Sequence, residues 1–268
     1  MKSKFKFLAL TLLVIGSLAF IKCNKDDSIT PLSGTPIAGT AKIDATWTFD
    51  KVHSNVGWQS PFMDFSATML TGRFNSFGFT PAFIFDETNL SQCSLNAWVQ
   101  LSTFNTGESG RDSYGKCGLN YLGITYLDSL KTLVNPASDT AWVTSNTFQK
   151  VGTGYVATGT FTFNRYRAPS GFADGTRITK PITIYVSYNG TTDFDSNGDG
   201  VNDKLRAGFT TSFTFNRSDY VDVNSTKAFD PFIPDDATAA TNTTYGVWSS
   251  SVADEMTITV NSEFYLNH

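Results

Sequence analysis

Alternation between bulky apolar residues and Thr, Ser or Asn is the feature that most constrains the fold of this chain. It runs through residues 161–164, 182–188, 213–216 and 256–260. Because successive side chains of a β-strand point to opposite faces, the pattern predicts strands with one apolar and one polar face. Less regular runs raise the expected number to about eight or nine strands. Residues 114–134 could hold one short helix.

An apolar face shared by so many strands must be hidden, and either a closed barrel or a two-sheet sandwich would hide it. Periodicity does not separate these two architectures. Aromatic residues make up 14% of the chain, with 23 phenylalanines, whereas charged residues make up only 16%. Phenylalanines crowded on one face either fill a thick core or line an apolar tunnel that holds a long guest.

Charge and composition exclude several classes of function. The formal net charge is -4 and the pI is near 5.1, so the chain lacks the basic surface that nucleic-acid binding requires. Two histidines and three cysteines are few for a zinc or haem centre. No Ser-His-Asp grouping and no cofactor-binding loop is visible in the sequence, so we predict a protein that is not an enzyme and has no catalytic cofactor.

The first residues have the pattern of an export signal. Lys2, Lys4 and Lys6 precede an uncharged run over residues 7–21, which ends just before Cys23. A helix of about 15 residues rises only ~22 Å, short of the ~30 Å hydrocarbon layer. A cleaved signal is therefore favoured over a membrane-spanning helix.

The sequence around Cys23 resembles the lipidation site of a bacterial lipoprotein, although Lys22 stands where a small residue is usual. The resemblance implies a signal peptide over residues 1–22, a lipidated Cys23 at the start of a flexible tether over 23–42, and a folded domain over 43–268. It also implies an exported protein that a lipid anchors to the outer membrane, at the periplasmic face or the cell surface.

Two further cysteines, Cys93 and Cys117, would be exported to an oxidising compartment, which favours a disulfide between them. Closing a loop of about 25 residues would stabilise the fold by roughly 3 kcal/mol. Two separate buried thiols are the alternative.

An Asp-rich stretch resembles a calcium-binding loop. Five oxygen-bearing side chains occur at alternate positions, with one gap of four residues and with glycines between the later ones: Asp193, Asp195, Asn197, Asp199 and Asp203. Calcium takes six to eight oxygen ligands, and such a loop can wrap it. Lys204 stands where an EF-hand has its bidentate Glu, so Asp203 would substitute. We predict a structural Ca²⁺ site, with a solvated acidic turn as the alternative.

Several motifs together resemble the YceI-like lipid/polyisoprenoid-binding family. The opening motif is Trp-x-x-Asp-x-x-His-Ser-x-Val over residues 47–56, followed by Gly72-x-Phe74. Later blocks in family order are residues 159–163, 180–184, 215–220 and 252–258. The pair Arg111-Asp112 also matches, but Ser113-Tyr114 stands where the family has His-Leu. Residues 193–203 and 222–244 resemble insertions.

The resemblance implies an all-β fold, an extended lipocalin-like antiparallel barrel whose tunnel binds an isoprenoid, a quinone or another long apolar lipid. Burying ~15 to 20 carbons at ~0.8 kcal/mol each gives ~12 to 16 kcal/mol, from which the cost of immobilising the flexible ligand is subtracted. His53 is interpreted as a hydrogen-bonded strand residue first and a ligand contact second. A homodimer is a further implication. The candidate lipid-binding residues are Phe74, Phe77, Phe79, Phe161, Phe163, Phe213, Phe215, His53 and Arg111.

A surface protein that binds glycans or mediates adhesion is the competing hypothesis. Such a protein would be a calcium-stabilised β-sandwich whose exposed aromatic rings stack on sugars. The candidate rings are Trp47, Trp58, Trp98, Trp142 and Trp248. An exposed row of these tryptophans would favour glycan binding, and an enclosed tunnel would favour lipid carriage.

Overall fold

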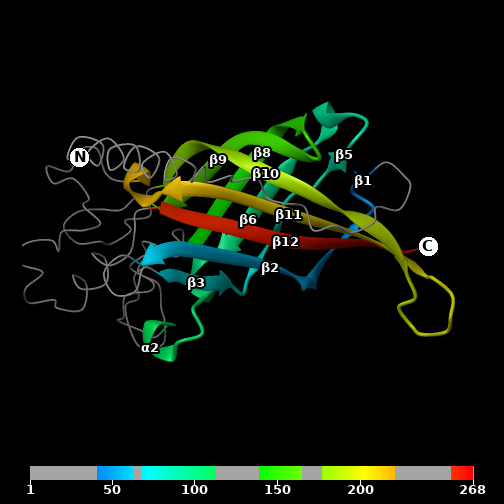
Figure 1. Ribbon diagram of the computed structural model, residues 1–268, viewed down its shortest axis with the longest axis horizontal. Coiled ribbons are helices and arrows are strands. Elements are labelled where there is room, and N and C mark those ends of the chain that lie inside the picture. The colour runs from blue at the N-terminus through cyan, green and yellow to red at the C-terminus, as the bar shows by residue number, and fades with distance from the viewer. Residues whose placement is uncertain (1–40, 63–67, 113–138, 165–176, 221–254, 268) are drawn as a thin grey trace, which may run out of the picture. The chain divides into compact units, whose positions relative to one another are not determined.

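Two antiparallel sheets make up the computed structural model of the protein, which describes residues 41–62, 68–112, 139–164, 177–220 and 255–267 (Figure 1). All of these residues lie in one compact unit. The large sheet has ten strands in the order β4-β6-β8-β9-β10-β11-β12-β2-β3-β7, and the small sheet pairs β1 with β5.

Eight strands have six or more residues, and the other four are short. The long strands are β2 (Thr48–Phe62), β3 (Thr68–Phe74), β6 (Leu95–Gln100), β8 (Thr140–Val151), β9 (Gly154–Asn164), β10 (Arg177–Phe194), β11 (Lys204–Asn216) and β12 (Glu255–Asn267). The short strands are β1 (Lys42–Ile43), β4 (Phe77–Phe79), β5 (Phe85–Asp86) and β7 (Phe104–Asn105). Single helical turns are η1 (Leu90–Gln92), η2 (Leu101–Thr103), α2 (Ser109–Asp112) and η4 (Arg217–Tyr220).

The predicted all-β, lipocalin-like antiparallel fold is confirmed, and its eight long strands agree with the expected number. Two details differ. The runs at 47–49 and 56–58 belong to one strand, β2, whereas the run at 74–79 divides into β3 and β4. The chain turns there because Asn75 N–H donates to the Thr103 carbonyl and Gln100 N–H donates to the Ser76 carbonyl. The helix expected within 114–134 lies outside the described residues.

The large sheet curls on itself into a half-barrel. Strand β4, at one edge of the sheet, approaches β2, and the Phe49 ring lies 4.9 Å from Phe79 and 6.1 Å from Phe77, centroid to centroid. Register shifts interrupt the pairing of β2 with β12, β8 with β9, and β10 with β11. Bulges of this kind increase local twist and bend a strand, which allows strands this long to curl.

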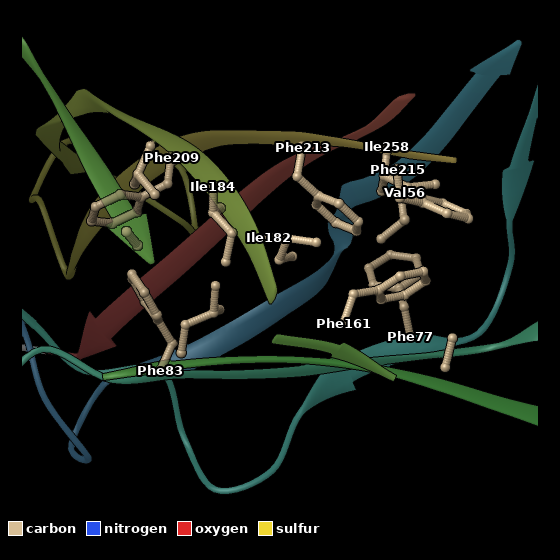
Figure 2. Packing of buried hydrophobic residues seen from close by; sticks show 14 of the residues in the cluster. Val56, Phe77, Phe83, Phe161, Ile182, Ile184, Phe209, Phe213, Phe215 and Ile258 are labelled. Atoms are coloured by element: carbon tan, nitrogen blue, oxygen red, sulfur yellow. The ribbon is translucent and has the colours of Figure 1, made fainter. Parts of the chain in front are cut away.

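The inner face of the curl is apolar, and Figure 2 shows side chains from opposite walls pointing toward one another. The outer face carries threonine pairs that join neighbouring strands through their hydroxyls. These pairs are Thr144–Thr160, Thr162–Thr179 and Thr214–Thr257, with oxygen separations of 2.8, 2.8 and 3.0 Å. The alternation in the sequence therefore separates a dry inner face from a hydrogen-bonded outer face.

Gly159 is a position where the curl requires the absence of a side chain. A Cβ atom there would lie 2.2 Å from the Thr144 carbonyl oxygen on the paired strand β8. We expect Gly159→Ala to lower the free energy of unfolding by about 1–3 kcal/mol, measured by urea denaturation, because backbone must move. Gly57→Ala is the control, since its Cβ would meet nothing closer than 3.7 Å. Equal losses in the two variants would refute this reading.

Candidate functional site

A cavity of about 70 Å³ lies inside the curled sheet. All seven phenylalanines that the sequence singled out line it: Phe74, Phe77, Phe79, Phe161, Phe163, Phe213 and Phe215. They come from the consecutive strands β3 and β4 and from β9 and β11, so three parts of the chain that are distant in sequence supply one lining. Smaller apolar residues that sequence reasoning did not single out complete the wall, among them Ala97, Ala141, Val143, Ile258 and Val260.

Phenylalanine rings fill much of the space at one end of the cavity. The Phe161 ring lies 4.7 Å from that of Phe215 and 5.2 Å from that of Phe213, between centroids. Below them Tyr220, which is 1% exposed, packs 5.6 Å from Phe163. Desolvation in this apolar setting raises the pKa of the Tyr220 hydroxyl, so it stays protonated.

The cavity is smaller than the expected tunnel. A void needs roughly 10–15 Å³ in this measure to hold one water molecule. The observed volume of about 70 Å³ therefore has room for only a handful of carbon-sized groups, not for 15 to 20 carbons. A long chain could enter only if phenylalanine rings rotated away.

The opposite end of the cavity is closed by tightly packed rings, which we call the aromatic plug: Phe83, Phe85, Tyr155, Phe209 and Phe264. Phe83 lies 5.2 Å from Phe209 and 5.4 Å from Phe264. Phe85 lies 4.9 Å from Tyr155 and 5.1 Å from Phe209. The cavity lining on β11 and β12 stops where the side chains of Phe209 and Phe264 begin.

None of the described residues that line the cavity carries a charge. Nearly all are aliphatic or aromatic, and the hydroxyl groups among them belong to Thr211 and Ser262. Such a lining offers dispersion contacts and burial of apolar surface, but no group that would act as an acid, base or metal ligand.

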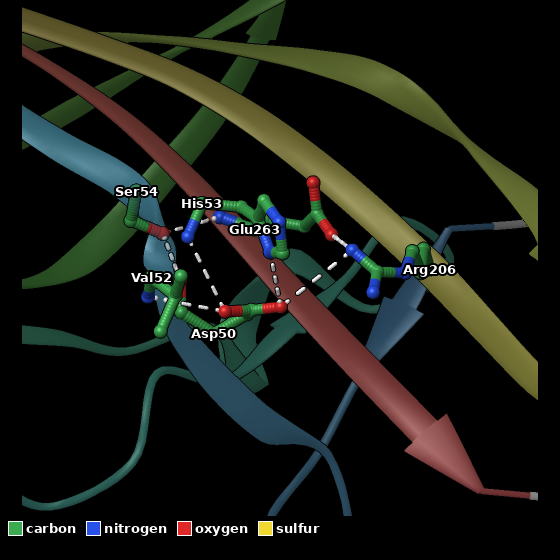
Figure 3. Close-up of polar contacts among 6 residues, drawn as sticks. All are labelled: Asp50, Val52, His53, Ser54, Arg206 and Glu263. Atoms are coloured by element: carbon green, nitrogen blue, oxygen red, sulfur yellow. Dashed lines mark hydrogen bonds and ion pairs between the residues drawn. The ribbon is translucent and has the colours of Figure 1, made fainter. Parts of the chain in front are cut away.

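His53 lies in a polar cluster outside the cavity lining (Figure 3). Its Nδ1 is 2.8 Å from Asp50 Oδ2, and its side chain is 55% exposed. Ser54 Oγ donates to the Asp50 carbonyl and accepts from the Glu263 N–H. The hydrogen-bonded arrangement favoured by the sequence is therefore present. Contact of His53 with an enclosed ligand gains no support, because a bulge in β2 directs residues 51–54 away from the interior.

Arg206 joins this cluster to strand β11. Its guanidinium contacts Glu263, lies 3.6 Å from Asp50 Oδ2 and packs 4.3 Å from the centre of the Phe194 ring. Asp50, His53 and Glu263 have side chains of the types that bind metals, with ligand atoms within 4.8 Å of one another. The positive charge of Arg206 already neutralises part of the negative charge of Asp50 and Glu263. We therefore interpret the cluster as a structural link between β2, β11 and β12.

The Asp50 carboxylate should make stability depend on pH. Burial raises its pKa, but hydrogen bonds from the side chain and backbone of His53 outweigh burial, and the net pKa is lowered. Its stabilising contribution is therefore complete above the unfolded pKa of about 4 and is lost as pH falls through the folded pKa. We expect Asp50→Asn to destabilise the protein at pH 7 and to differ less from wild type at pH 3. Urea denaturation at both pH values measures this, and a constant difference would contradict it.

Arg111 belongs to the short helix α2, but its side chain is outside the described residues. Its neighbour Asp112 accepts hydrogen bonds from the N–H and the hydroxyl of Thr106, at 3.0 and 2.8 Å. The Asp112 carboxylate of the Arg-Asp motif therefore holds the loop in place. A ligand contact by Arg111 stays a prediction.

The Asp-rich stretch forms the connection between β10 and β11. Asp195 accepts hydrogen bonds from the N–H groups of Gly198 and Gly200, both at 2.7 Å. These glycines have φ values of 78° and 88°, a conformation that other residues rarely adopt. Asp203 accepts from the N–H and hydroxyl of Ser196. The backbone bond from Gly200 is the main reason that the pKa of Asp195 is lowered.

Calcium binding by this loop stays a prediction. If it is right, millimolar Ca²⁺ should raise the melting temperature of the wild-type protein, because only the folded loop gathers the carboxylates. Asp199→Asn should remove most of that increase while leaving the melting temperature in EDTA nearly unchanged. Differential scanning calorimetry checks this, and equal Ca²⁺ effects on both proteins, or no effect, would contradict it.

The cysteine predictions fall largely outside the described residues. Cys93 is 1% exposed, its Sγ accepts a hydrogen bond from Asp86 N–H at 3.2 Å, and burial raises the pKa of its thiol. Cys117 and Cys23 lie in segments that the structure does not describe. The Cys93–Cys117 disulfide and the lipidation of Cys23 therefore stay predictions. Within the described segments, no helix has the length and apolar character needed to cross a membrane.

Within the described segments, one tryptophan is buried and three are only partly exposed, so they do not form the fully exposed row that glycan binding would need. Trp58 is 2% exposed and stacks on Phe104 with 4.8 Å between ring centres. Trp47 is partly buried against the core, and Trp98 and Trp142 face each other across β6 and β8. Trp248 lies outside the described residues. Among the four described tryptophans, the adhesive hypothesis therefore lacks its binding platform.

A curled antiparallel sheet around an apolar interior defines the class of lipocalin-like β-proteins. The family model of the YceI-like domain matches residues 47–264, so this chain belongs to the YceI-like family. A comparison with solved structures found a polyisoprenoid-binding domain from Saccharophagus degradans, implicated in plant cell wall breakdown. It is 11% identical, with a TM-score of 0.38, and the match covers 82% of this chain and 98% of that chain. No curated protein matched the sequence.

Proposed function

We propose that this protein binds and carries an isoprenoid or another long apolar lipid in the cavity of the half-barrel, without catalysing a reaction. The observation that carries the proposal is the meeting of all seven predicted phenylalanines around one apolar cavity. Family membership supports lipid binding in general. The uncharged lining supports a binding role, because every contact it offers is one that an apolar chain can use.

Ring movement is part of this proposal, since the cavity holds only a small fraction of a long chain. Each carbon that enters gains ~0.8 kcal/mol from burial, and this gain offsets the cost of rotating rings and ordering the ligand. The rings around Phe161 and Phe215 are the ones that would move, because they fill the end of the cavity away from the aromatic plug.

We further propose that the protein is exported and attached to a membrane through a lipid on Cys23. The basic and apolar start of the chain and the position of Cys23 support this proposal. An anchored carrier would hold its cavity close to the bilayer from which an apolar ligand comes.

Organic extraction of protein purified from its native host, followed by mass spectrometry, tests the function directly. A stoichiometric long-chain lipid is the expected result, and heat-denatured protein loaded with the same extract is the control for surface adsorption. The stripped protein should then bind added isoprenoid alcohols in a saturable titration. A clean apoprotein that also fails to bind isoprenoid alcohols, quinones and fatty amphiphiles would overturn the proposal.

A further inference from the structure

Two hydroxyl groups interrupt the otherwise apolar wall of the cavity. Thr211 on β11 and Ser262 on β12 both line it. Thr211 pairs with Val260, and Ser262 follows Val260 by two residues, so the two hydroxyl-bearing side chains are diagonal neighbours on one face. Side chains in this relation are within reach of a common small group. Neither residue was singled out by the sequence.

Neither hydroxyl has a hydrogen-bond partner among the described residues. Ser262 is nevertheless only 7% exposed. Of the other buried serines, Ser60 Oγ donates to the Glu255 carbonyl and Ser145 Oγ to the Thr158 carbonyl, both at 2.7 Å, whereas Ser187 resembles Ser262 in having no side-chain hydrogen bond to a described residue. Ser262 Oγ is not one of the described side-chain atoms that are fully buried without a partner, so its hydroxyl is accessible from the cavity that it lines. A bound molecule could form a hydrogen bond with it there.

The two hydroxyls lie at the same end of the cavity, so its two ends differ chemically. Ser262 pairs with Phe209 of the aromatic plug, so the hydroxyls lie at the closed end. Phe163 and Phe215 line the other end. No described cavity residue is charged, so a phosphate or carboxylate at the closed end would lose its hydration without gaining a counter-charge.

From this arrangement we infer that the ligand ends in a neutral oxygen, a hydroxyl or carbonyl group, which Thr211 and Ser262 receive at the closed end of the cavity. The apolar chain then extends toward Phe163 and Phe215. The ligand class is a neutral long-chain alcohol, aldehyde or ketone, and neither a pure hydrocarbon nor a charged amphiphile. This inference rests on the proposed function.

Three probes with one carbon skeleton test the inference: geranylgeraniol, its hydrocarbon without the hydroxyl, and geranylgeranyl monophosphate. Binding is measured by quenching of tryptophan fluorescence. Wild-type protein should bind the alcohol about 25-fold more tightly than the hydrocarbon, since each of the two neutral hydrogen bonds contributes roughly five-fold. It should bind the monophosphate more weakly than either.

The variants Ser262→Ala and Thr211→Val remove the hydroxyls with little change of volume. Each should weaken binding of the alcohol by about five-fold, and the double variant by about 25-fold, while hydrocarbon binding changes less than about two-fold. Thr214→Val, on the outer face of the same strand, is the matched control. Without ligand, Ser262→Ala should melt close to wild type, because the substitution breaks no hydrogen bond to a described residue.

The outcomes separate the two proposals. If no probe binds the wild-type protein, the lipid-binding function fails and the inference fails with it. If alcohol and hydrocarbon bind equally, and the variants bind both as the wild type does, the function stands and the inference is wrong. Preferential binding of the monophosphate would also overturn the inference.

Discussion

Ala141→Leu should weaken lipid binding by about 100-fold while leaving the fold intact. Ala141 is 2% exposed and lines the cavity, so three added carbon atoms would project into a void of only about 70 Å³. Extra groups of this size in an apolar pocket discriminate by 10-fold or more per methylene. The free energy of unfolding of the ligand-free protein should change by less than about 1 kcal/mol, because the new atoms fill empty space.

Ala157→Leu is the matched control for this filling experiment. Ala157 is fully buried on β9 but does not line the cavity, so the same added atoms meet packed side chains. We expect it to lower the free energy of unfolding by about 1–3 kcal/mol. Urea denaturation and titration with geranylgeraniol measure both variants. Unchanged lipid binding by folded Ala141→Leu protein would place the ligand elsewhere.

Phe209→Ala should cause the largest loss of stability, about 3–5 kcal/mol. Phe209 is 1% exposed and its ring contacts those of Phe83, Phe85, Tyr188 and Phe264. Removing the ring leaves a cavity that its neighbours, held on separate strands, can only partly close.

Phe194→Ala is the control for the plug variant. Phe194 is 40% exposed and its ring packs on Arg206, so its removal should cost no more than about 1 kcal/mol. The difference between the two midpoints in urea measures the contribution of burial. Similar losses from both variants would show that the aromatic plug does not hold the sheet together.

The strands and the cavity-facing phenylalanines were predictable because both follow from a period of two. Once Phe213 is inward, Phe215 is inward as well, and antiparallel pairing places Ile258 and Met256 beside them. The same rule puts Phe161 and Phe163 on the inner face of β9. Local alternation therefore selected the correct lining without any knowledge of how the strands pair.

Features that depend on register and on irregular backbone were not predictable. Phe83 and Phe85 come from a segment without alternation, so nothing in the sequence indicated that they would close the cavity. The bulge that moves His53 outward depends on how β2 pairs with β12. The size of the cavity depends on ring packing between distant strands. Ser262 had a usable signal, since it continues the inward series 256, 258 and 260, but serine is also common on outer faces.

Among the described residues, the rings of the aromatic plug pack closely across one end of the cavity. If a guest enters and leaves by the other end, both directions share one barrier, so a variant that raises this barrier slows arrival and departure alike. A variant that only tightens binding slows departure alone. A longer residence time together with a slower capture rate in variants of Phe163 or Phe215, which line that other end, would identify such a barrier.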